Sequence, residues 1–405
     1  MDFSSLPDNV LLQIFHHLQF PERLRLGCVS KRFNGISLLC VTQLKVLNLK
    51  DNVYERITPE SLSILLNLCS TNLERINFPS SSSYHGQSDL LIETFSSFFY
   101  PRLTELDLGD APIGSPMFGE LIKRTPKLDH LISNGISALS YPQDAASDNL
   151  RRLDLCNCDE LFLRTFSGQN LEHFEASQTQ LASQEITDQF FINCPRLQTL
   201  VFKRLQCVNC SIYVSLHFWR LSSLRSLLAW NSDFDHVTDS ILITIAKSFP
   251  QLEVLCLARM NVTGVGVAAL ANLKYIRKLT LVCNKTDNDI DDGVRQMAKC
   301  STLEFAQFCV NMTQVTLIML MRSCPWLSFL WINSIRDVEI DDVALGILKS
   351  FNVLLKRKLK VRIRDRCLQV WKSKKVEEAV NELKSANDVI LRFQEGDFFY
   401  YPAAA

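Results

Sequence analysis

The motif Leu-x-x-Leu-x-Leu recurs along most of this chain of 405 residues, and no other feature constrains the fold as strongly. Twelve copies, several of them degenerate, lie 21 to 30 residues apart. They begin at residues 44, 73, 103, 128, 150, 171, 197, 224, 252, 276, 303 and 327. The apolar positions alternate within each copy, which predicts a short strand with one buried face.

A second pattern lies between the copies and predicts a helix in each repeat. In residues 56–70 and 236–250 a threonine precedes apolar residues at helical spacing, and in 289–301 and 339–351 an aspartate does so. Thr and Asp are favoured helix N-caps, and the apolar spacing gives each helix a buried face. Strand, turn and helix at this period indicate a stack of repeats.

One of these linkers contains a glycine pattern that is also typical of dinucleotide-binding loops. Residues 261–273, NVTGVGVAALANL, include Gly264-x-Gly266-x-x-Ala269 after a strand-like segment. The first glycine of a phosphate loop must stand directly at the strand end, whereas here Met260 to Thr263 intervene. Thr263 also occupies the cap position of the other linkers. We therefore expect a repeat helix and no nucleotide cofactor.

The repeats resemble a leucine-rich-repeat solenoid of the cysteine-containing kind, over residues 44–364. The resemblance implies an α/β fold with about 12 to 13 repeats. Parallel strands would line the concave face of a curved solenoid, and helices would cover the convex face. Residues 356–365, KRKLKVRIRD, alternate like a thirteenth strand, and residues 365–405 are expected to cap the array.

Residues 1–43 lack the repeat and resemble an F-box. The resemblance is carried by the dipeptide Leu6-Pro7, the apolar segment 10–18, Pro21 at the start of a second helix, and CVSKRF at 28–33. Phe33 stands where the family often has Trp. The resemblance implies a three-helix segment that docks a Skp-type adaptor through Leu6, Pro7, Leu11, Ile14, Phe15, Leu18, Val29 and Phe33.

Physical reasoning also favours a partner for this segment. The apolar residues of 8–18 cover an arc of about 200°, which is wider than the stripe that a helix buries against one neighbour. A segment of about 40 residues rarely buries so much apolar surface alone. The alternative is that the segment is only the N-terminal cap that a repeat array requires.

The resemblance therefore implies a substrate receptor of a cullin–RING ubiquitin ligase of the Skp–cullin–F-box type. Such a receptor is not an enzyme. It holds a protein substrate on its repeats and raises the concentration of substrate lysines near the conjugating enzyme. The alternative function is a leucine-rich-repeat scaffold that binds a partner without directing ubiquitination. The identity of the substrate cannot be read from the sequence.

The outward strand positions predict where a substrate would bind. In the early repeats they form an ordinary solvated surface of Arg75, Asn77, Glu105, Asp107, Arg152, Asp154, His173 and Glu175. From the eighth repeat they are apolar, and we expect an exposed patch of Leu228, Trp230, Val254, Cys256, Val282, Phe305, Phe329 and Trp331. The next strand adds Lys358, Lys360, Arg362 and Arg364, which suit acidic or phosphorylated residues beside an apolar anchor. Alternatively, the tail GDFFYYP at 396–402 covers the patch.

Apparent metal sites are incomplete. Cys207-x-x-Cys210 with His217 nearby lacks the second ligand pair of a closed zinc site. The aspartates of 287–292 lack the glycine and the bidentate glutamate of a calcium loop. We expect no metal and no cofactor.

Charge and hydropathy limit the kinds of partner that we expect. The 43 basic residues balance the 43 acidic ones, so we expect neither nucleic acid nor an anionic membrane as a partner. No apolar run approaches the roughly 20 residues that span a bilayer. The first residues lack a secretory signal, and the 14 cysteines are expected to be reduced and largely buried. These features favour the cytoplasm, the nucleus or both.

Overall fold

The computed structural model of the protein describes fourteen stretches of the chain. They are residues 5–18, 20–49, 58–78, 88–110, 113–134, 149–157, 160–181, 183–204, 206–207, 217–230, 237–283, 290–335, 359–363 and 389–393. The chain forms two compact units. Unit 1 is Met1–Leu197 with Leu205–Ile212, and unit 2 is Gln198–Arg204 with Tyr213–Ala405. No helix in the described stretches is long and apolar enough to cross a membrane.

Unit 1 begins with three helices, α1 (Asp8–His17), α2 (Phe20–Gly27) and α3 (Lys31–Thr42). They confirm the predicted three-helix segment, including a second helix that begins near Pro21. Ser30 is the N-cap of α3, and its hydroxyl accepts a hydrogen bond from the backbone N–H of Phe33. This bond satisfies one of the N–H groups that the first helical turn leaves unpaired.

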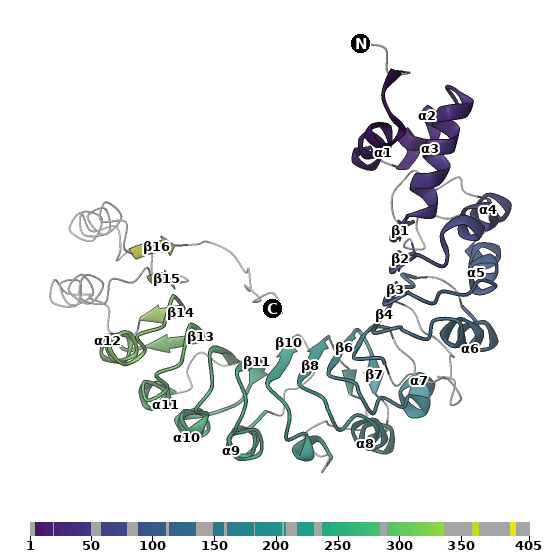
Figure 1. Ribbon diagram of the computed structural model, residues 1–405. Helices are drawn as coiled ribbons and strands as arrows, with labels where there is room; N and C mark the ends of the chain where they lie inside the picture. Colours follow the sequence, from purple (N-terminus) through teal and green to yellow (C-terminus); the bar gives the residue numbers. More distant parts are fainter. Residues whose placement is uncertain are drawn as a thin grey trace. The chain divides into compact units, whose positions relative to one another are not determined.

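The remainder of unit 1 is a parallel sheet with helices on its outer side (Figure 1). The strands are, in spatial order, β1 (Val46–Asn48), β2 (Arg75–Asn77), β3 (Glu105–Asp107), β4 (His130–Ser133), β5 (Arg152–Cys156) and β6 (His173–Ser177). The helices are α4 (Pro59–Cys69), α5 (Ser88–Ser96), α6 (Ser115–Lys123), α7 (Glu160–Thr165) and α8 (Gln184–Asn193). A short second sheet pairs β7 (Gln180–Leu181) with β9 (Gln206–Cys207).

Unit 2 repeats the same arrangement. Its parallel strands are, in spatial order, β8 (Thr199–Lys203), β10 (Ser226–Trp230), β11 (Val254–Met260), β12 (Lys278–Cys283), β13 (Phe305–Met312), β14 (Phe329–Ile335), β15 (Leu359–Ile363) and β16 (Val389–Phe393). Its helices are the 3₁₀ helices η5 (Phe218–Arg220) and η6 (Leu270–Asn272), and α9 (Asp239–Ser248), α10 (Gly264–Ala269), α11 (Asp291–Met297) and α12 (Gln314–Ser323). All twelve predicted repeat strands are confirmed, and the predicted thirteenth strand is β15. The strand β16 extends the sheet beyond the predicted solenoid boundary, and the predicted helix within 339–351 lies outside the described residues.

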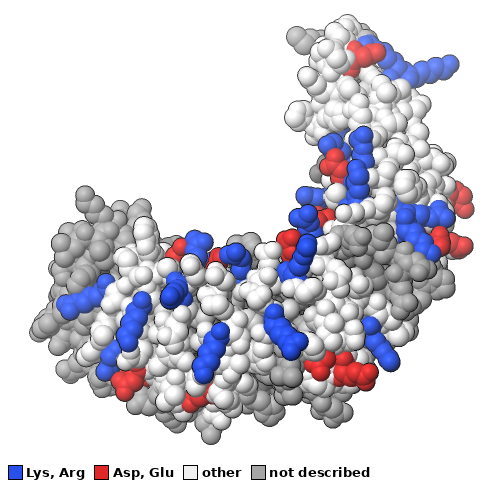
Figure 2. Space-filling view, turned by 60° about the horizontal axis from the view of Figure 1, so that its bottom comes forward, with Lys and Arg blue, Asp and Glu red and all other residues white. Residues whose placement is uncertain are grey.

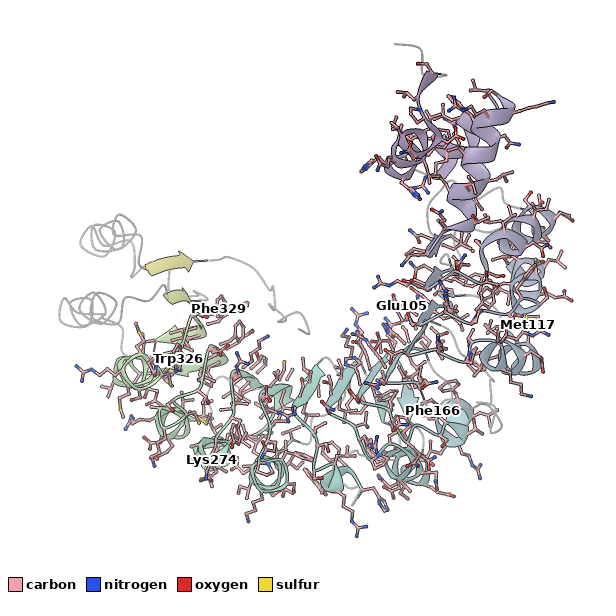
Figure 3. All side chains as sticks on the ribbon, viewed as in Figure 1. Glu105, Met117, Phe166, Lys274, Trp326 and Phe329 are labelled. Carbon is pink, nitrogen blue, oxygen red and sulfur yellow. The ribbon has the colours of Figure 1, made fainter. Side chains whose placement is uncertain are left out.

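The middle apolar position of each motif forms the core ladder beneath the sheet. In unit 1 it holds Leu47, Ile76, Leu106, Leu131, Leu153 and Phe174, which lie in register and are buried. In unit 2 it holds Leu200, Leu227, Leu255, Leu279, Ala306 and Leu330, which are also buried. Even the degenerate copy with Ala306 keeps its register, because the neighbouring strands fix it. Figure 3 shows both sides of this sheet, with Glu105 on the inner face of β3 and Met117 on the outer helix α6.

The described cysteines are mostly core residues, as predicted. Cys69, Cys194, Cys300 and Cys324 are buried and none of them is in a disulfide. Burial raises the pKa of the Cys69 thiol to about 12 and that of Cys300 to about 11, so both remain protonated at neutral pH. They act as small apolar side chains with a weak donor. Cys210 lies outside the described residues.

The segment with the glycine pattern is a repeat helix. Thr263 is the N-cap of α10, and its hydroxyl accepts from the backbone N–H of Val265. A Cβ atom on Gly266 would lie 2.3 Å from Oδ1 of Asp239, so this glycine permits close packing of α10 on α9. The glycines thus serve contacts between neighbouring repeats.

Candidate functional site

The N-terminal helices enclose a small core of their own. Leu11 and Phe15 from α1 pack against Ile36 and Cys40 from α3. The rings of Phe15 and Phe33 meet edge to face, with centroids 5.8 Å apart. The Arg32 guanidinium donates to the Asp8 carboxylate at 2.6 Å and to the Leu6 carbonyl, which ties α3 to the start of α1.

This core corrects part of the predicted adaptor surface. Leu11 and Phe15 are each only 1% exposed, so their side chains lie inside the segment and not on its surface. One part of the wide apolar arc of α1 is buried against α3, and the rest of it is half-buried. Leu6, Ile14, Leu18 and Phe33 are half-buried, whereas Pro7 and Val29 are exposed. The exposed apolar residues that sequence reasoning missed are Leu24, Leu38 and Leu39.

The inner face of unit 1 carries a charged cluster around Asp154 on β5. His130 Nε2 lies 2.9 Å from Asp154 Oδ2, and His173 Nε2 lies 3.3 Å from Asp154 Oδ1. Arg152 Nε donates to the same carboxylate at 3.0 Å. These residues come from three neighbouring strands whose register sets His130, Arg152 and His173 side by side. The predicted ordinary solvated surface is therefore wrong here, because the carboxylate is largely buried among its partners.

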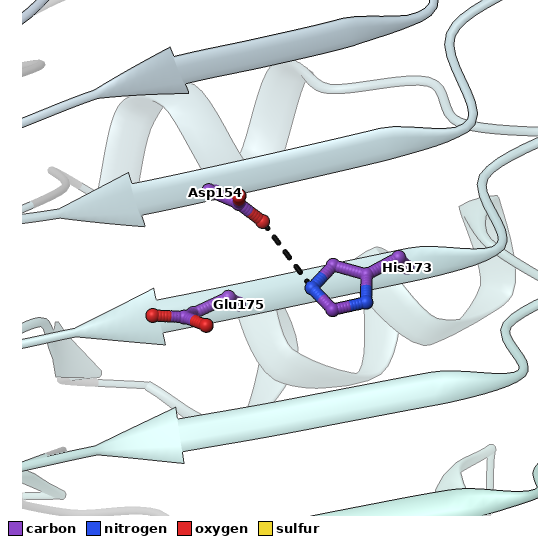
Figure 4. Close-up of side chains that lie close together, drawn as sticks. All are labelled: Asp154, His173 and Glu175. Carbon is purple, nitrogen blue, oxygen red and sulfur yellow. Dashed lines mark ion pairs between the residues drawn. The ribbon is translucent and has the colours of Figure 1, made fainter. Parts of the chain in front are cut away.

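The pKa of Asp154 shows the balance of forces in this cluster. Burial raises the pKa, but the hydrogen bond with His130, the nearby His173 imidazole and the charge of Arg152 lower it more strongly, and the net shift is well below the ordinary value. Asp154, His173 and Glu175 also bring one ligand atom each within 4.8 Å of one another, a spacing that a metal ion could bridge (Figure 4). The Arg152 guanidinium already neutralises Asp154, which disfavours a cation there.

The inner face of unit 2 differs from the predicted exposed apolar patch. Leu228 and Cys256 form a buried cluster with Val201 on the inner side of β8, β10 and β11, and Trp331 is 6% exposed. Two side chains of each strand point to this face. The second of them is buried at Leu228, Cys256 and Trp331, whereas the first stays half-exposed at Val254, Phe305 and Phe329. The expectation that all these side chains are accessible is wrong for Leu228, Cys256 and Trp331.

The register also corrects the continuity of that patch. On β12 the inner-face positions in register with this patch are polar, namely Lys278 and Thr280. Lys278 pairs with Val254 of β11 on one side and with Phe305 of β13 on the other. Val282 lies one row further along, beside Ala258. The row of apolar side chains is therefore interrupted at β12.

Two aromatic rings on this face are only partly buried. Phe305 and Phe329 are half-exposed and stacked, with centroids 4.6 Å apart and planes 2° apart. Lys278 pairs with Phe305 on one side, and Lys360 pairs with Phe329 on the other. Lys358, Arg364 and residues 396–402 lie outside the described residues, as do the side chains of Trp230, Lys360 and Arg362.

Charges of both signs occur on the surface of the described residues. Figure 2 shows basic side chains spread over the repeats, with acidic side chains close to several of them. Many are paired between successive repeats, as Arg225 with Glu253 and Arg277 with Glu304.

Comparisons with known proteins bear on the N-terminal segment and on the repeats. Residues 3–39 match the family model described as F-box-like. A Caenorhabditis elegans protein named "Putative RNA-binding protein EEED8.10" is 21% identical over 317 residues. That match covers 69% of this chain and 43% of the relative, so the chain spans less than half of the relative's length.

Among solved structures, the chain is similar to an internalin from Listeria monocytogenes, with a TM-score of 0.42, 15% identity, and coverage of 78% of this chain and 87% of that chain. The Rad7 and Elc1 complex in yeast gives a TM-score of 0.44, 19% identity and 88% coverage of each chain. The plant peptide hormone receptor RGFR1 in complex with RGF2 gives 0.38, 16% identity, and coverage of 67% of this chain and 46% of that chain. The F-box-like match thus covers the segment that precedes the parallel strand–helix repeats of this chain.

Proposed function

We propose that the protein is a substrate receptor of an SCF-type ubiquitin ligase, acting in the cytoplasm, the nucleus or both. The observation that carries the proposal is the F-box-like match of residues 3–39, which coincides with the three helices that precede the repeats. In this role the segment binds a Skp-type or elongin-type adaptor and through it the cullin. The chain itself performs no chemistry, and it brings a bound protein close to the conjugating enzyme.

The adaptor-binding surface in this proposal consists of the apolar side chains that the three-helix core leaves accessible. Pro7 and Val29 are the exposed members of the predicted set, and Leu24 on α2 adds a third. Ile14 and Leu18 of α1, also in the predicted set, are half-buried. Exposed apolar side chains of this kind stabilise a complex when a partner removes them from water.

The substrate-binding surface in this proposal lies on the inner face of unit 2. The stacked rings of Phe305 and Phe329 supply an apolar anchor, because half-exposed aromatic side chains bury a large area at little cost in side-chain entropy. Lys278 pairs with Phe305 in the register, and Lys360 pairs with Phe329. A protein segment with an apolar residue next to acidic or phosphorylated residues suits this arrangement.

A scaffold that binds a partner without directing ubiquitination would use the same repeats, and it differs in lacking adaptor and cullin binding. The name of the Caenorhabditis elegans relative concerns RNA, but the 43 basic and 43 acidic residues of this chain give it no net attraction for a polyanion.

Co-purification with a Skp-type adaptor and a cullin tests the proposal, with Val29→Glu as the informative variant. Val29 is 67% exposed, so the substitution leaves the helical core intact and places a charge on the docking surface. Val265→Glu is the matched control, since Val265 on α10 is also 67% exposed. We expect Val29→Glu to reduce adaptor recovery at least about tenfold and Val265→Glu to leave it unchanged. Wild-type protein that recovers no adaptor and no cullin would favour the scaffold function.

A further inference from the structure

A cavity of about 550 Å³ lies between the N-terminal helices and the first repeats. His16 and Arg23 reach it from α1 and α2. Lys45, Asn72 and Arg102 reach it from the segments just before β1, β2 and β3. Its volume falls within the range of roughly 300 to 1,000 Å³ that small-molecule sites occupy.

The charge around this cavity is one-sided. Of the described residues that line it, Arg23, Lys45 and Arg102 are positively charged and none is acidic. Within the described part of the chain, the Arg23 guanidinium donates to two backbone carbonyls, to Leu18 at 2.9 Å and to His16 at 3.0 Å. Arg102 donates to the amide oxygen of Asn72 at 3.2 Å. Neither arginine forms an ion pair with a carboxylate of the described residues. The pKa of Glu74 is lowered mainly by its hydrogen bond with Lys45 and also by the positive charge of Arg102, so Arg102 has a carboxylate in its electrostatic range without a direct contact.

The remaining cation has a partner at the edge of the cavity. Lys45 Nζ lies 2.9 Å from the Glu74 carboxylate, and Glu74 does not line the cavity. Both side chains of this pair are exposed, and exposed pairs of this kind contribute little and exchange readily. An anion in the cavity can therefore engage the Lys45 ammonium while Glu74 turns to solvent.

The polar groups of the cavity are held in place by contacts with the backbone and with each other. Asn72 Nδ2 donates to the Thr42 carbonyl at 2.8 Å, which fixes the amide that Arg102 contacts. His16 Nε2 lies 3.2 Å from Gln43 Oε1. Such preorganisation lowers the entropic cost of binding, because fewer side chains must be immobilised by the ligand.

We propose that this cavity binds a small molecule that carries two or more phosphate groups. Guanidinium groups match phosphate oxygens in pairs, and the ammonium of Lys45 adds a third positive charge from another direction. One phosphate cannot contact all these groups across such a volume, whereas a polyphosphate can. The ligand would link α1 and α2 to the first three repeats and would stabilise unit 1.

The test is isothermal titration of tripolyphosphate into the purified full-length chain at about 0.15 M salt, where exposed charges are screened beyond roughly 8 Å. The informative variant is Lys45→Gln with Arg102→Gln, since both side chains are exposed and neither supports the core. Lys247→Gln with Lys274→Gln is the charge-matched control, because both lysines are exposed and far along the chain in unit 2. Circular dichroism checks that both variants are folded.

We expect tripolyphosphate to bind the wild type and the control alike, and to bind the Lys45/Arg102 variant at least about tenfold more weakly, as for the loss of charge-assisted hydrogen bonds. The melting temperature of the wild type should rise with ligand, and that of the Lys45/Arg102 variant should rise less. Equal weakening in both variants would show unspecific attraction and would overturn the proposal. The proposal would also be overturned if tripolyphosphate did not bind, or if citrate bound as tightly as tripolyphosphate.

Discussion

The carboxylate of Asp291 on α11 binds the N-cap of the next repeat helix, Thr313, through two hydrogen bonds. Asp291 Oδ1 accepts from the Thr313 backbone N–H at 2.8 Å, and Oδ2 accepts from the Thr313 hydroxyl at 2.9 Å. Asp239 on α9 bonds to Thr263 in the same way, at 2.8 and 2.6 Å. An acidic residue in the first turn of one helix thus positions the start of the following helix.

Asp291→Ala should destabilise unit 2 by about 3 kcal/mol, because it removes a buried acceptor and leaves the donors of Thr313 and Thr316 unsatisfied. The neighbouring Asp292 is the control. Its side chain is 84% exposed and pairs with Arg295 at 3.1 Å, so Asp292→Ala should change stability by less than about 0.5 kcal/mol. Urea unfolding of the two variants measures both values, and equal losses would contradict the role of Asp291.

Gly293→Ala should destabilise α11 by about 1 to 3 kcal/mol or more, since the added Cβ would lie 2.4 Å from the carbonyl oxygen of Gly264 on α10. The contact is with backbone, which cannot turn aside. Gly35→Ala is the control, because Gly35 lies in the exposed part of α3 with nothing within 4 Å of its Cβ position. That change should stabilise by about 0.5 to 1 kcal/mol. Thermal denaturation of both variants should therefore shift in opposite directions.

The strands were predictable from sequence because their signal is repeated. Each copy of the motif alone is weak, but a ladder such as Leu255, Leu279 and Ala306 fixes the register even where one leucine is missing. The helix caps Thr58 and Thr263 were predictable for the same reason. For α11 the sequence pattern predicts Asp291 as the N-cap. The N-cap is instead Ile290, and Asp291 is the first residue of the helix.

Side-chain exposure on the inner face was not predictable from alternation alone. Alternation distinguishes the core side of a strand from the inner side, but it does not show that Leu228 is covered by its neighbours Val201 and Cys256. The turns after the strands were also hidden. Asn157, Gln178 and Arg204 each follow a strand with a positive φ, and they share no residue type that a pattern could detect.

The stability of unit 1 should depend on the ionised form of Asp154. Its pKa is lowered in the folded state, so its contribution is present above the unfolded-state value of about 3.9 and is lost only as pH falls through the lower folded-state value. Melting temperatures of the wild type and of Asp154→Asn should therefore differ at pH 7 and pH 5, and should converge only below about pH 4. Convergence already at pH 5 would contradict this account. Asp129→Asn is the control, since Asp129 is exposed and 3.6 Å from Arg151, and it should have little effect.

Removal of residues 389–405 should cause aggregation. β16 pairs in parallel with all of β15, so its loss exposes the N–H and C=O groups of β15 as a new sheet edge. Removal of residues 395–405 is the control, because it leaves β16 in place. Light scattering and gel filtration should detect association only in the longer deletion, and a monodisperse longer deletion would show that β15 tolerates an open edge.

Phe305→Ala with Phe329→Ala should reduce capture of the protein substrate, because the double change removes the stacked pair that the proposed site uses as its anchor. Trp326→Ala is the control. Trp326 is 70% exposed but lies in the turn before β14, outside the inner face. Proximity labelling under proteasome inhibition measures capture as the set of proteins that accumulate around the wild type and are lost from each variant. The opposite outcome is that Trp326→Ala loses the substrates and the phenylalanine variant keeps them. This result would place the site on the turns before the strands, because an exposed aromatic side chain contributes to binding only where the partner covers it.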